Sequence, residues 1–543
     1  MKIAQGSGMV FHLARKEFLN NLVSARFVIG FLLCLVLIPF SILINVSRYR
    51  EKTAQFRIDS GAAETSVREV RVYSKLRPEV VFAPEPLSVF NTGISDQVGN
   101  RVKVWLGDKP LLAAGKTAAG DNPFLASFFS VDFADIAAII FSLLALIFSY
   151  DAFSREKEDG TLKLGLSNSV SRSTILSGKV LGILLTLLPV LVFSFLMSAV
   201  LVLFSKDIAF SGVEWGRIAL LFSASLLYLS VFVLIGLFVS ARSKTSVTSL
   251  VLCLFLWVAF VFLIPTLSSN FAASFTRVQS KDNLDRVLAD LDKQREEKIR
   301  QGYKAQGLPE GYSCWWCWSG LDGFMETYGN AGAVFETFRR KAMISEPIRL
   351  EYADIRWAPQ KAYLDGLSRQ ARAARALSFA SPAGLFRAIA SAVCSTDLES
   401  HLARMDRVRR YREIFIRYFE AKAVFSSFSW ITPIPPSSFM TEDALISKRT
   451  GGAFKTSREF EDWVFKQKDP LESRRNLRTL TLPNDGPQGF PFLDISDMPR
   501  FMEPRKSLFG GLEGSMAGAG LLLAEIVLLF FLGFVAFARA DVR

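Results

Sequence analysis

Histidine and cysteine are scarce in this chain, which has two histidines and five cysteines among 543 residues. Histidine is the side chain that most often moves protons in enzymes, and His12 and His401 lie far apart in the sequence. Aspartates and glutamates are plentiful, but the sequence shows no recognisable pair of a nucleophile and its general base. We therefore expect a chain that is not catalytic by itself and that binds no metal or cofactor of its own.

Three of the five cysteines fall in one region of the chain. Cys314 and Cys317 form a C-x-x-C pair in the segment SCWWCW, which is compatible with a disulfide, a redox dithiol or half of a zinc site. Cys394 and His401 could complete a zinc site, but their spacing is irregular and nothing in the sequence brings them near the pair. We expect a disulfide among Cys314, Cys317 and Cys394, with free buried thiols as the alternative and metal or redox chemistry as the least favoured interpretation.

Apolar residues, in contrast, are abundant: they make up 50% of the chain, and 48 residues are phenylalanine. A helix needs about 20 mostly apolar residues to cross the hydrocarbon core of a bilayer. Six runs approach or exceed this length, at residues 27–46, 133–150, 180–204, 217–239, 246–267 and 515–538. The sequence thus predicts a multi-pass membrane protein, and the even number of spans places both termini on one side.

Basic residues beside these runs indicate the orientation, because lysine and arginine near a span are retained in the cytoplasm. They gather before the first run, in the loop at 151–179 and after the last run, whereas the short loop at 205–216 offers only Lys206 against two acidic residues. Both termini are therefore predicted to be cytoplasmic, in the cell (inner) membrane. The net charge of +13 partly reflects this retention, so we expect contact with membrane lipid and no binding of nucleic acid.

The remaining segments predict a mainly α membrane protein with soluble parts. An amphipathic pattern at 10–26 predicts a helix on the inner membrane surface. Alternating residues at 69–72 and 101–104 predict short strands in a small α+β outer insertion. Helical periodicity predicts a larger, mostly helical outer insertion, with helices at 283–300, 333–346, 360–377 and 397–425, followed by loops or short strands at 431–507.

The predicted chain begins with a cytoplasmic amphipathic helix at 1–26, followed by span 1 at 27–46, outer domain 1 at 47–132 and span 2 at 133–150. A cytoplasmic loop at 151–179 then leads to spans 3, 4 and 5 at 180–204, 217–239 and 246–267. Outer domain 2 at 268–514, span 6 at 515–538 and a cytoplasmic tail at 539–543 complete the order.

One carboxylate, Glu525, lies well inside the last apolar run. A charge at that depth is costly, so this side chain is expected to be paired, protonated or facing a cavity. The functional interpretation is a polar contact on a substrate path or at a subunit interface. The structural alternative is a packing hydrogen bond to a neighbouring helix, for example to a serine within 193–198 or 223–230.

The loop at 151–179 is a charged interruption between two long apolar runs. Residues 156–159 form a compact charged cluster, Gly160 permits a break in the backbone, and Thr161 can cap a helix that Leu162 continues. A short helix parallel to the membrane could pass force from a soluble partner to the second and third spans. The alternative is a solvated loop without a partner.

This loop resembles the signature region of type-2 ABC exporter permeases. In that family an aromatic residue and Asp end the second span, and E-x-G-T-L opens a coupling element before a serine-arginine step and a G-K pair. The matching residues are Tyr150, Asp151, Glu158, Gly160, Thr161, Leu162, Ser171, Arg172, Gly178 and Lys179.

Both ends of the chain extend the resemblance. Lys16-Glu17-Phe18 and the closing Asp541-Val542-Arg543 are similar to the subgroup with two large outer insertions, to which permeases of gliding-motility and copper-site maturation systems belong. Within the insertions the resemblance is confined to their placement and to short pieces such as Ser381-Pro382 and residues 395–398.

The resemblance implies a half-transporter, an exporter whose six spans pair with a second permease copy or a paralogue, as a homo- or heterodimer. Two cytoplasmic ABC ATPases, which carry the ATP and Mg, would bind its loops and drive the spans between two states. It assigns ATPase coupling to Asp151, Glu156, Glu158, Gly160, Thr161, Leu162, Arg172 and Lys179. A competing hypothesis, prompted by the size of 268–514, is an assembly scaffold that uses ATPase motion to act on an outer partner without moving a solute.

Overall fold

Helices dominate the structure, a computed structural model that describes residues 2–112, 132–162, 170–205, 207–309, 317–319, 325–327, 332–466, 491–504, 507–511 and 513–539. The longer helices are α1 (Lys2–Leu22), α2 (Ala25–Arg68), α3 (Phe133–Ser149), α6 (Arg172–Leu203), α7 (Gly212–Arg242), α8 (Ser246–Val258), α9 (Ile264–Phe275), α10 (Lys281–Ala305), α11 (Gly332–Ser378), α12 (Pro382–Val393), α13 (Leu398–Ala421) and α17 (Glu513–Ala538). Shorter ones are α4 (Ser154–Glu158), α14 (Glu442–Arg449) and α15 (Ser457–Phe465).

Strands form only two small antiparallel pairs among the described residues. β1 (Glu79–Val81) pairs with β2 (Arg101–Lys103), and β3 (Cys317–Ser319) pairs with β4 (Met325–Thr327). The strand expected near 101–104 is therefore present. Its partner is 79–81 and not the predicted segment at 69–72, most of which follows the end of α2 without regular structure.

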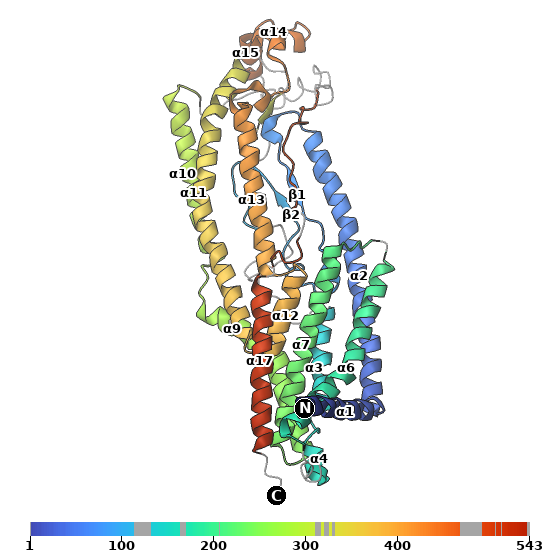
Figure 1. The fold of residues 1–543 in the computed structure, drawn as a ribbon. Coiled ribbons are helices and arrows are strands. Elements are labelled where there is room, and N and C mark those ends of the chain that lie inside the picture. Colours follow the sequence, from blue (N-terminus) through green and yellow to red (C-terminus); the bar gives the residue numbers. More distant parts are fainter. Residues whose placement is uncertain are drawn as a thin grey trace.

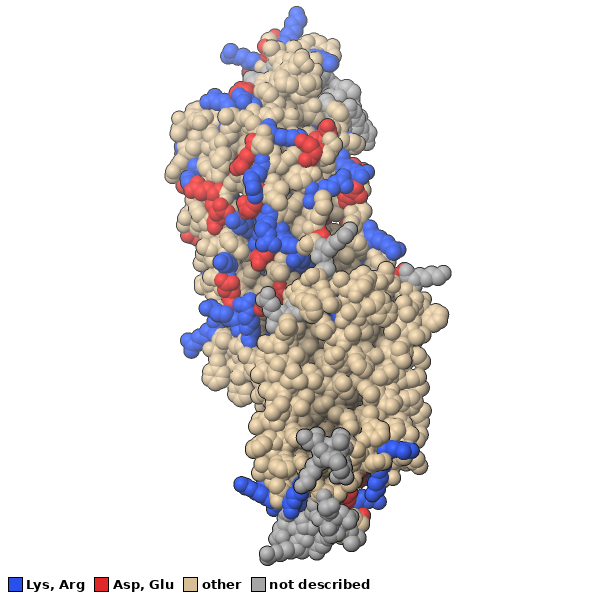
Figure 2. Space-filling model, in the orientation of Figure 1, with Lys and Arg blue, Asp and Glu red and all other residues tan. Residues whose placement is uncertain are grey.

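Six helices of the described chain are long and apolar enough to cross a membrane, and they correspond one to one to the six predicted runs. They cover Ala25–Arg68, Phe133–Glu158, Arg172–Leu203, Gly212–Arg242, Ser246–Phe275 and Ser515–Ala538. In Figure 2 the lower half of the molecule is almost free of charged side chains, whereas the upper half carries both signs and a few charges return at the lower tip. This belt confirms a mainly α, multi-pass membrane protein.

The two ends of the molecule differ in character (Figure 1). α1, α4 and the C-terminal end of α17 lie together at one end, with α1 running across the spans. We call this the proximal end. α10, α11, α13, α14, α15 and the strand pair β1–β2 lie on the other side of the spans, and with the outer part of α2 they form what we call the distal domain.

α2 is longer than the first predicted span, which ended at Val46. The helix continues without a break to Arg68, because the charged stretch after Val46 is rich in alanine, glutamate and arginine, which favour helix. At about 1.5 Å per residue its 44 residues extend roughly 66 Å. The helix therefore carries the chain from the membrane region into the distal domain.

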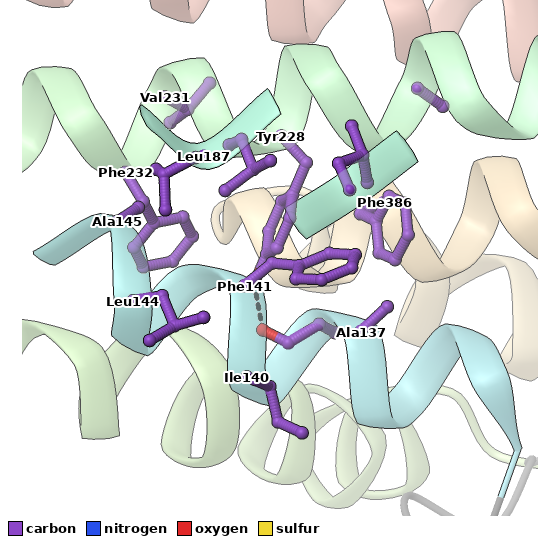
Figure 3. Close-up of a cluster of buried hydrophobic side chains, with 14 of the residues drawn as sticks. Ala137, Ile140, Phe141, Leu144, Ala145, Leu187, Tyr228, Val231, Phe232 and Phe386 are labelled. Carbon is purple, nitrogen blue, oxygen red and sulfur yellow. Dashed lines mark hydrogen bonds between the residues drawn. The ribbon is translucent and has the colours of Figure 1, made fainter. Parts of the chain in front are cut away.

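α12 lies among the spans, although the sequence placed these residues in the second outer domain. Its twelve residues are too few to cross a bilayer, yet nearly all of them are buried against α3, α7 and α17. Ser381 caps the helix by accepting from the amides of Ala383 and Gly384, and Pro382 occupies its first turn. Phe386 stacks on Tyr228 of α7, with ring centroids 4.8 Å apart, inside the apolar cluster of Figure 3.

A buried arginine ties α12 to the spans. Arg217, in the first turns of α7, is 3% exposed. Its guanidinium donates to the carbonyls of Val393 (3.3 Å), Ser507 (3.0 Å) and Gly510 (2.9 Å), and to the hydroxyl of Ser395. Arg217 thus joins α7, the end of α12 and the segment before α17 at the level where the distal domain begins.

The distal domain is mostly helical, as predicted, but its helices begin and end at other residues than predicted. The helices expected at 333–346 and 360–377 are one helix, α11, which continues through Pro347 and Pro359. A proline inside a helix removes a hydrogen bond, and the packing of α11 along α10 and α9 offsets that loss. The segment at 431–507, expected as loops or strands, holds α14 and α15, while residues 467–490 lie outside the described chain.

His401 makes the stability of the distal domain depend on pH. Its imidazole is 2% exposed in α13, and burial, helped by the charges of Arg404 and Arg409, lowers its pKa to about 4. The unfolded chain, with a pKa near 6.5, binds the proton first as the pH falls. Folding free energy is therefore lost between about pH 6.5 and pH 4, by roughly 3 kcal/mol from this residue.

The measurement is the melting temperature of the purified protein at pH 7.5 and pH 4.5. We expect a smaller acid-induced drop in His401→Gln than in the wild type, because glutamine cannot take up the proton. The matched control is His12→Gln, which alters the exposed histidine of α1 and is expected to follow the wild type. An acid-induced drop of equal size in both variants would contradict the role given to His401.

Candidate functional site

The candidate site is the chain between α3 and α6 at the proximal end, residues 151–179, which we call the proximal loop. α3 ends at Ser149, and α4 occupies only Ser154–Glu158. Gly160 then has a φ of +69°, a left-handed conformation that glycine adopts without strain. Thr161 and Leu162 are helical, so Thr161 does not precede that helix as a cap, and its hydroxyl donates to the carbonyl of Glu156 at 3.4 Å. Residues 163–169 lie outside the described chain.

A buried lysine links the proximal loop to α1. Lys179 Nζ lies 2.8 Å from Glu17 Oε1 of α1 and 2.8 Å from Glu156 Oε1 of α4, and it also faces the ring of Phe153. The lysine side chain is 6% exposed. A charge removed from water to this extent needs opposite charges and hydrogen bonds around it. The two carboxylates provide them and thereby fix α1, α4 and α6 to one another.

The side of α4 that faces the spans contacts the end of α7 and the start of α8. Ser240 Oγ accepts from the amides of Phe153 (2.9 Å) and Ser154 (3.0 Å). Amides at the start of a helix such as α4 have no acceptor within the helix itself. Lys157 Nζ donates to carbonyls at the C-terminal end of α7, including that of Ser243 at 3.1 Å. Such a cation also complements the negative end of the helix dipole.

Further contacts tie the proximal loop to α2, α8 and α17. Asp151 pairs with Arg26 of α2 at 2.8 Å. Glu158 Oε2 accepts from the hydroxyl of Ser246 at 2.5 Å. Arg172 donates to the last carbonyls of α17, including that of Phe537 at 2.8 Å. Every spanning helix therefore meets α4 or the segments beside it, either through these contacts or through chain continuity.

One side of α4 remains open to solvent. Arg155, Glu158, Asp159, Gly160 and Thr161 are all exposed, whereas Phe153, Ser154 and Leu162 are buried. Three of the five exposed residues are charged. The element thus has a buried side that is fixed to the helices and an exposed, charged side, which suits it to receive a soluble partner.

α1 crosses α6 at two glycines. A Cβ added to Gly182 would lie 2.9 Å from the Ala14 carbonyl oxygen and 2.6 Å from Glu17 Cβ, and one added to Gly178 would lie 2.7 Å from Leu13 Cβ. The absent side chains are what let the helices approach closely enough for Glu17 to reach Lys179.

We expect Gly182→Val to push α1 away from α6 and to lower the melting temperature of the protein, because overpacking at a helix contact costs about 1–3 kcal/mol. Gly520→Val is the matched control, since nothing lies within 4 Å of a Cβ at that helical position. Equal melting temperatures for the Gly182 variant and the wild type would contradict this account of the α1–α6 contact.

The structure brings several of the sequence-predicted residues together. Glu156 and Lys179 are paired, Asp151 and Arg172 hold neighbouring helices, Leu162 is buried, and Glu158, Gly160 and Thr161 lie on the exposed side. Glu17 and Arg26 were missed as members of the site. The sequence contained a signal for Glu17, because it sits inside the Lys16-Glu17-Phe18 segment of an amphipathic helix.

Glu525 lies in α17, away from the proximal loop. Its side chain is partly buried, and Oε2 has no hydrogen-bond partner among the residues that the structure describes. The packing hydrogen bond to a serine of α6 or α7, offered as the structural alternative, is not seen for this atom. Those serines donate within their own helices, as Ser194 does to Val190 and Ser225 to Leu221.

The structure tests only part of the disulfide predicted among Cys314, Cys317 and Cys394. Cys394 is a free, buried thiol at the end of α12, so no disulfide passes through it. Cys314 lies outside the described residues, and its bridge to Cys317 stays a prediction. Across the described chain no group of three or more His, Cys, Asp and Glu side chains is arranged to hold a metal ion.

Comparison with known families agrees with the membrane region. Residues 11–437 match the model of the ABC-2 family transporter protein, a match that begins within α1, covers the first five spans and ends in the distal domain. No curated relative matches the chain significantly. The chain belongs to the ABC-2 transporter family and is a transmembrane permease of the ABC transporter class. Membership implies association with a cytoplasmic ABC ATPase.

Proposed function

We propose that this permease is an exporter subunit driven by a separate cytoplasmic ATPase that docks on α4. The observation that supports it is the two-sided character of the proximal loop. The exposed side, formed by Arg155, Glu158, Asp159, Gly160 and Thr161, is charged, whereas the opposite side is joined to α1 through Lys179 and to α7 through Ser240.

The mechanism follows from these contacts. ATP and Mg are bound by the partner, and closure of the ATPases moves α4. Because α4 is fixed to α1 and α6 by one buried ion cluster, and to α7 by Ser240, these helices shift together. The spans then change between two arrangements with different access, which is a coupling of two sites through one two-state element.

Orientation is part of the proposal. Both termini and α4 are cytoplasmic and the distal domain is extracytoplasmic, in the cell (inner) membrane. Lysine and arginine at the proximal end support this placement, since basic residues near spans are retained inside. Figure 2 shows such residues at the lower tip, below the uncharged belt.

A second permease copy or a paralogue completes the transporter in this proposal. In each span, burial can be compared over an apolar stretch of 18 residues. Only 17% of this stretch is buried in Ser246–Phe275 and 22% in Ser515–Ala538, compared with 72% in Phe133–Glu158. α8 and α17 thus have faces available to another subunit, and lipid covers what remains. Glu525, with one buried oxygen unpaired in the described chain, is proposed as a polar contact at this interface.

The experiment is to express the permease with a cytoplasmic ABC ATPase from the same genome, purify the complex and reconstitute it in vesicles. We expect the two proteins to co-purify and ATP hydrolysis to drive vectorial movement of a solute. ATP turnover in a stable complex, without movement of any solute tested, would favour the scaffold hypothesis. Failure of the permease to bind the ATPase at all would contradict both.

A further inference from the structure

A cavity of about 200 Å³ lies where the membrane region meets the distal domain. Its walls come from the first turn of α3, from α9 and α12, from the C-terminal turns of α11 and from the start of α13. This space can hold on the order of ten water molecules, or a ligand of headgroup size. The cavity is distant in the fold from the proximal loop and plays no part in the contacts described there.

Arg387 of α12 lies in the wall with an unsatisfied donor. Its Nε donates to Asp135 Oδ1 at 2.6 Å and its Nη1 to the Val261 carbonyl at 3.2 Å. Nη2 is buried and has no acceptor anywhere in the described chain. A buried donor of a charged group that lacks an acceptor is unfavourable, so a ligand oxygen that reached this atom through a small movement of the Arg387 side chain would be stabilised there.

Arg375 of α11 lines the same cavity and is only loosely held. Its nearest acceptors are Asp397 Oδ2 at 3.7 Å and the Ala388 carbonyl at 3.4 Å. Arg372, also in the wall, is by contrast paired with both oxygens of Glu399 through Nε and Nη2, at 2.8 and 3.2 Å. Arg375, with its long contacts, and Arg387, with its unsatisfied Nη2, are the less completely paired arginines of the wall. Guanidinium groups match phosphate and carboxylate oxygens in shape and charge.

The rest of the wall is mixed. Its polar part includes three carboxylates, those of Asp135, Asp397 and Glu399, each of which pairs with one of the three arginines. Its apolar part is formed by Ile94, Pro265, Ala371, Ala374, Ala388 and Leu398, and a small hydrated ion would gain nothing from that part. A ligand with an acidic head and an apolar continuation would use both kinds of surface.

The exposed face of α9 connects the cavity to the membrane interface. Beyond the cavity residues Pro265 and Ser269, its side chains Leu267, Phe271 and Phe275 recur every four residues, and Phe275 is 80% exposed. Exposed basic residues follow the helix directly, at Arg277 and Lys281, and Figure 2 shows basic side chains gathered at the base of the distal domain. An apolar stripe followed by basic residues is typical of a segment at the membrane interface.

We propose that this cavity binds the phosphate or carboxylate head of an acidic amphiphile from the membrane leaflet on the distal side. The head lies between Arg375 and Arg387, with Nη2 of Arg387 as one donor, and the apolar part lies along the alanine-rich wall towards α9. The proposal does not depend on how the proximal loop couples to a partner, so either can fail alone.

The test uses the full-length purified protein and three probes: dioleoyl phosphatidic acid, dioleoyl phosphatidylcholine and inorganic phosphate. Binding is followed by native mass spectrometry and by the shift in melting temperature. We expect phosphatidic acid to bind at least about ten-fold more tightly than phosphatidylcholine, and inorganic phosphate not to displace it at millimolar concentration.

Two variants locate the site. Arg387→Gln combined with Asp135→Asn keeps a neutral hydrogen-bonding pair and removes the charged donor, and Ala374→Phe fills the cavity while leaving the ion pairs intact. Both are expected to lose about ten-fold or more in affinity for phosphatidic acid. The matched control is Arg404→Gln with Glu85→Gln, a buried pair at 3.2 Å in the distal domain, which should bind like the wild type.

Three results would overturn the proposal. The first is equal binding of phosphatidic acid by the wild type and by Ala374→Phe, which is independent of any folding defect in the paired variant. The second is equal affinity for the two lipids. The third is binding of inorganic phosphate with no binding of lipid, which would assign the cavity to a soluble anion.

Discussion

Replacing Gly160 with proline is expected to abolish association with the ATPase while the spans stay folded. Gly160 has a φ of +69°, whereas proline is restricted to about −65°. The substitution therefore redirects the chain between α4 and the helical turn at Thr161. Glu158→Arg should have the same effect by another route, because it reverses a charge on the exposed side and, within the described chain, removes the hydrogen bond from Ser246.

The measurement is co-purification of the ATPase with each variant from detergent-solubilised membranes, together with the amount of permease inserted. Glu351→Arg is the matched control, since it reverses an exposed acidic residue of α11 in the distal domain. It should retain the ATPase. Normal co-purification and normal coupled ATP hydrolysis in both proximal variants would rule out a coupling role for Glu158 and Gly160.

Replacing Lys179 with methionine is expected to uncouple ATP hydrolysis from movement of the spans. The substitution leaves Glu17 and Glu156 facing each other without the cation that each contacts at 2.8 Å. Breaking a buried ion pair costs about 3–5 kcal/mol, and the partial exposure of both carboxylates reduces this to roughly 2–3 kcal/mol. The link between α1, α4 and α6 is then lost, although the exposed side of α4 that meets the ATPase is unchanged.

The expected result is therefore a complex that still forms but hydrolyses ATP without driving transport. Adding Glu17→Gln and Glu156→Gln to Lys179→Met should restore much of the stability, because the cluster becomes neutral. Lys298→Met, which breaks an exposed pair with Glu351 at 2.7 Å, serves as the control and should behave like the wild type. If Lys179→Met transported normally, the buried cluster would have no part in coupling.

Local and periodic features of the chain could be predicted from the sequence. The six spans were found because each is a long apolar run. The break at Gly160 was found because a glycine directly after a charged cluster is a strong local signal for a turn. The resemblance of the proximal loop to a permease signature pointed to the family that the match over residues 11–437 then showed.

What was missed depends on contacts between distant parts of the chain. Glu17 and Lys179 are 162 residues apart in sequence, so their pairing exists only once α1 lies across α6. α12 was missed as a helix among the spans because a mostly apolar stretch of twelve residues is too short for any criterion based on bilayer thickness. The extension of α2 was missed because hydropathy falls after Val46 while helix propensity does not.

The most direct measurement of the central claim is site-specific photo-crosslinking in native membranes. A photoreactive residue at Asp159, on the exposed side of α4, is compared with one at Glu351, which has a similar side-chain exposure in the distal domain (59% and 51%). Coupling through α4 predicts a crosslink from position 159 to a protein that carries the phosphate-binding loop of an ABC ATPase, and none from position 351. A crosslink to that ATPase from position 351 but not from position 159 would contradict both the proposed docking site and the proposed orientation.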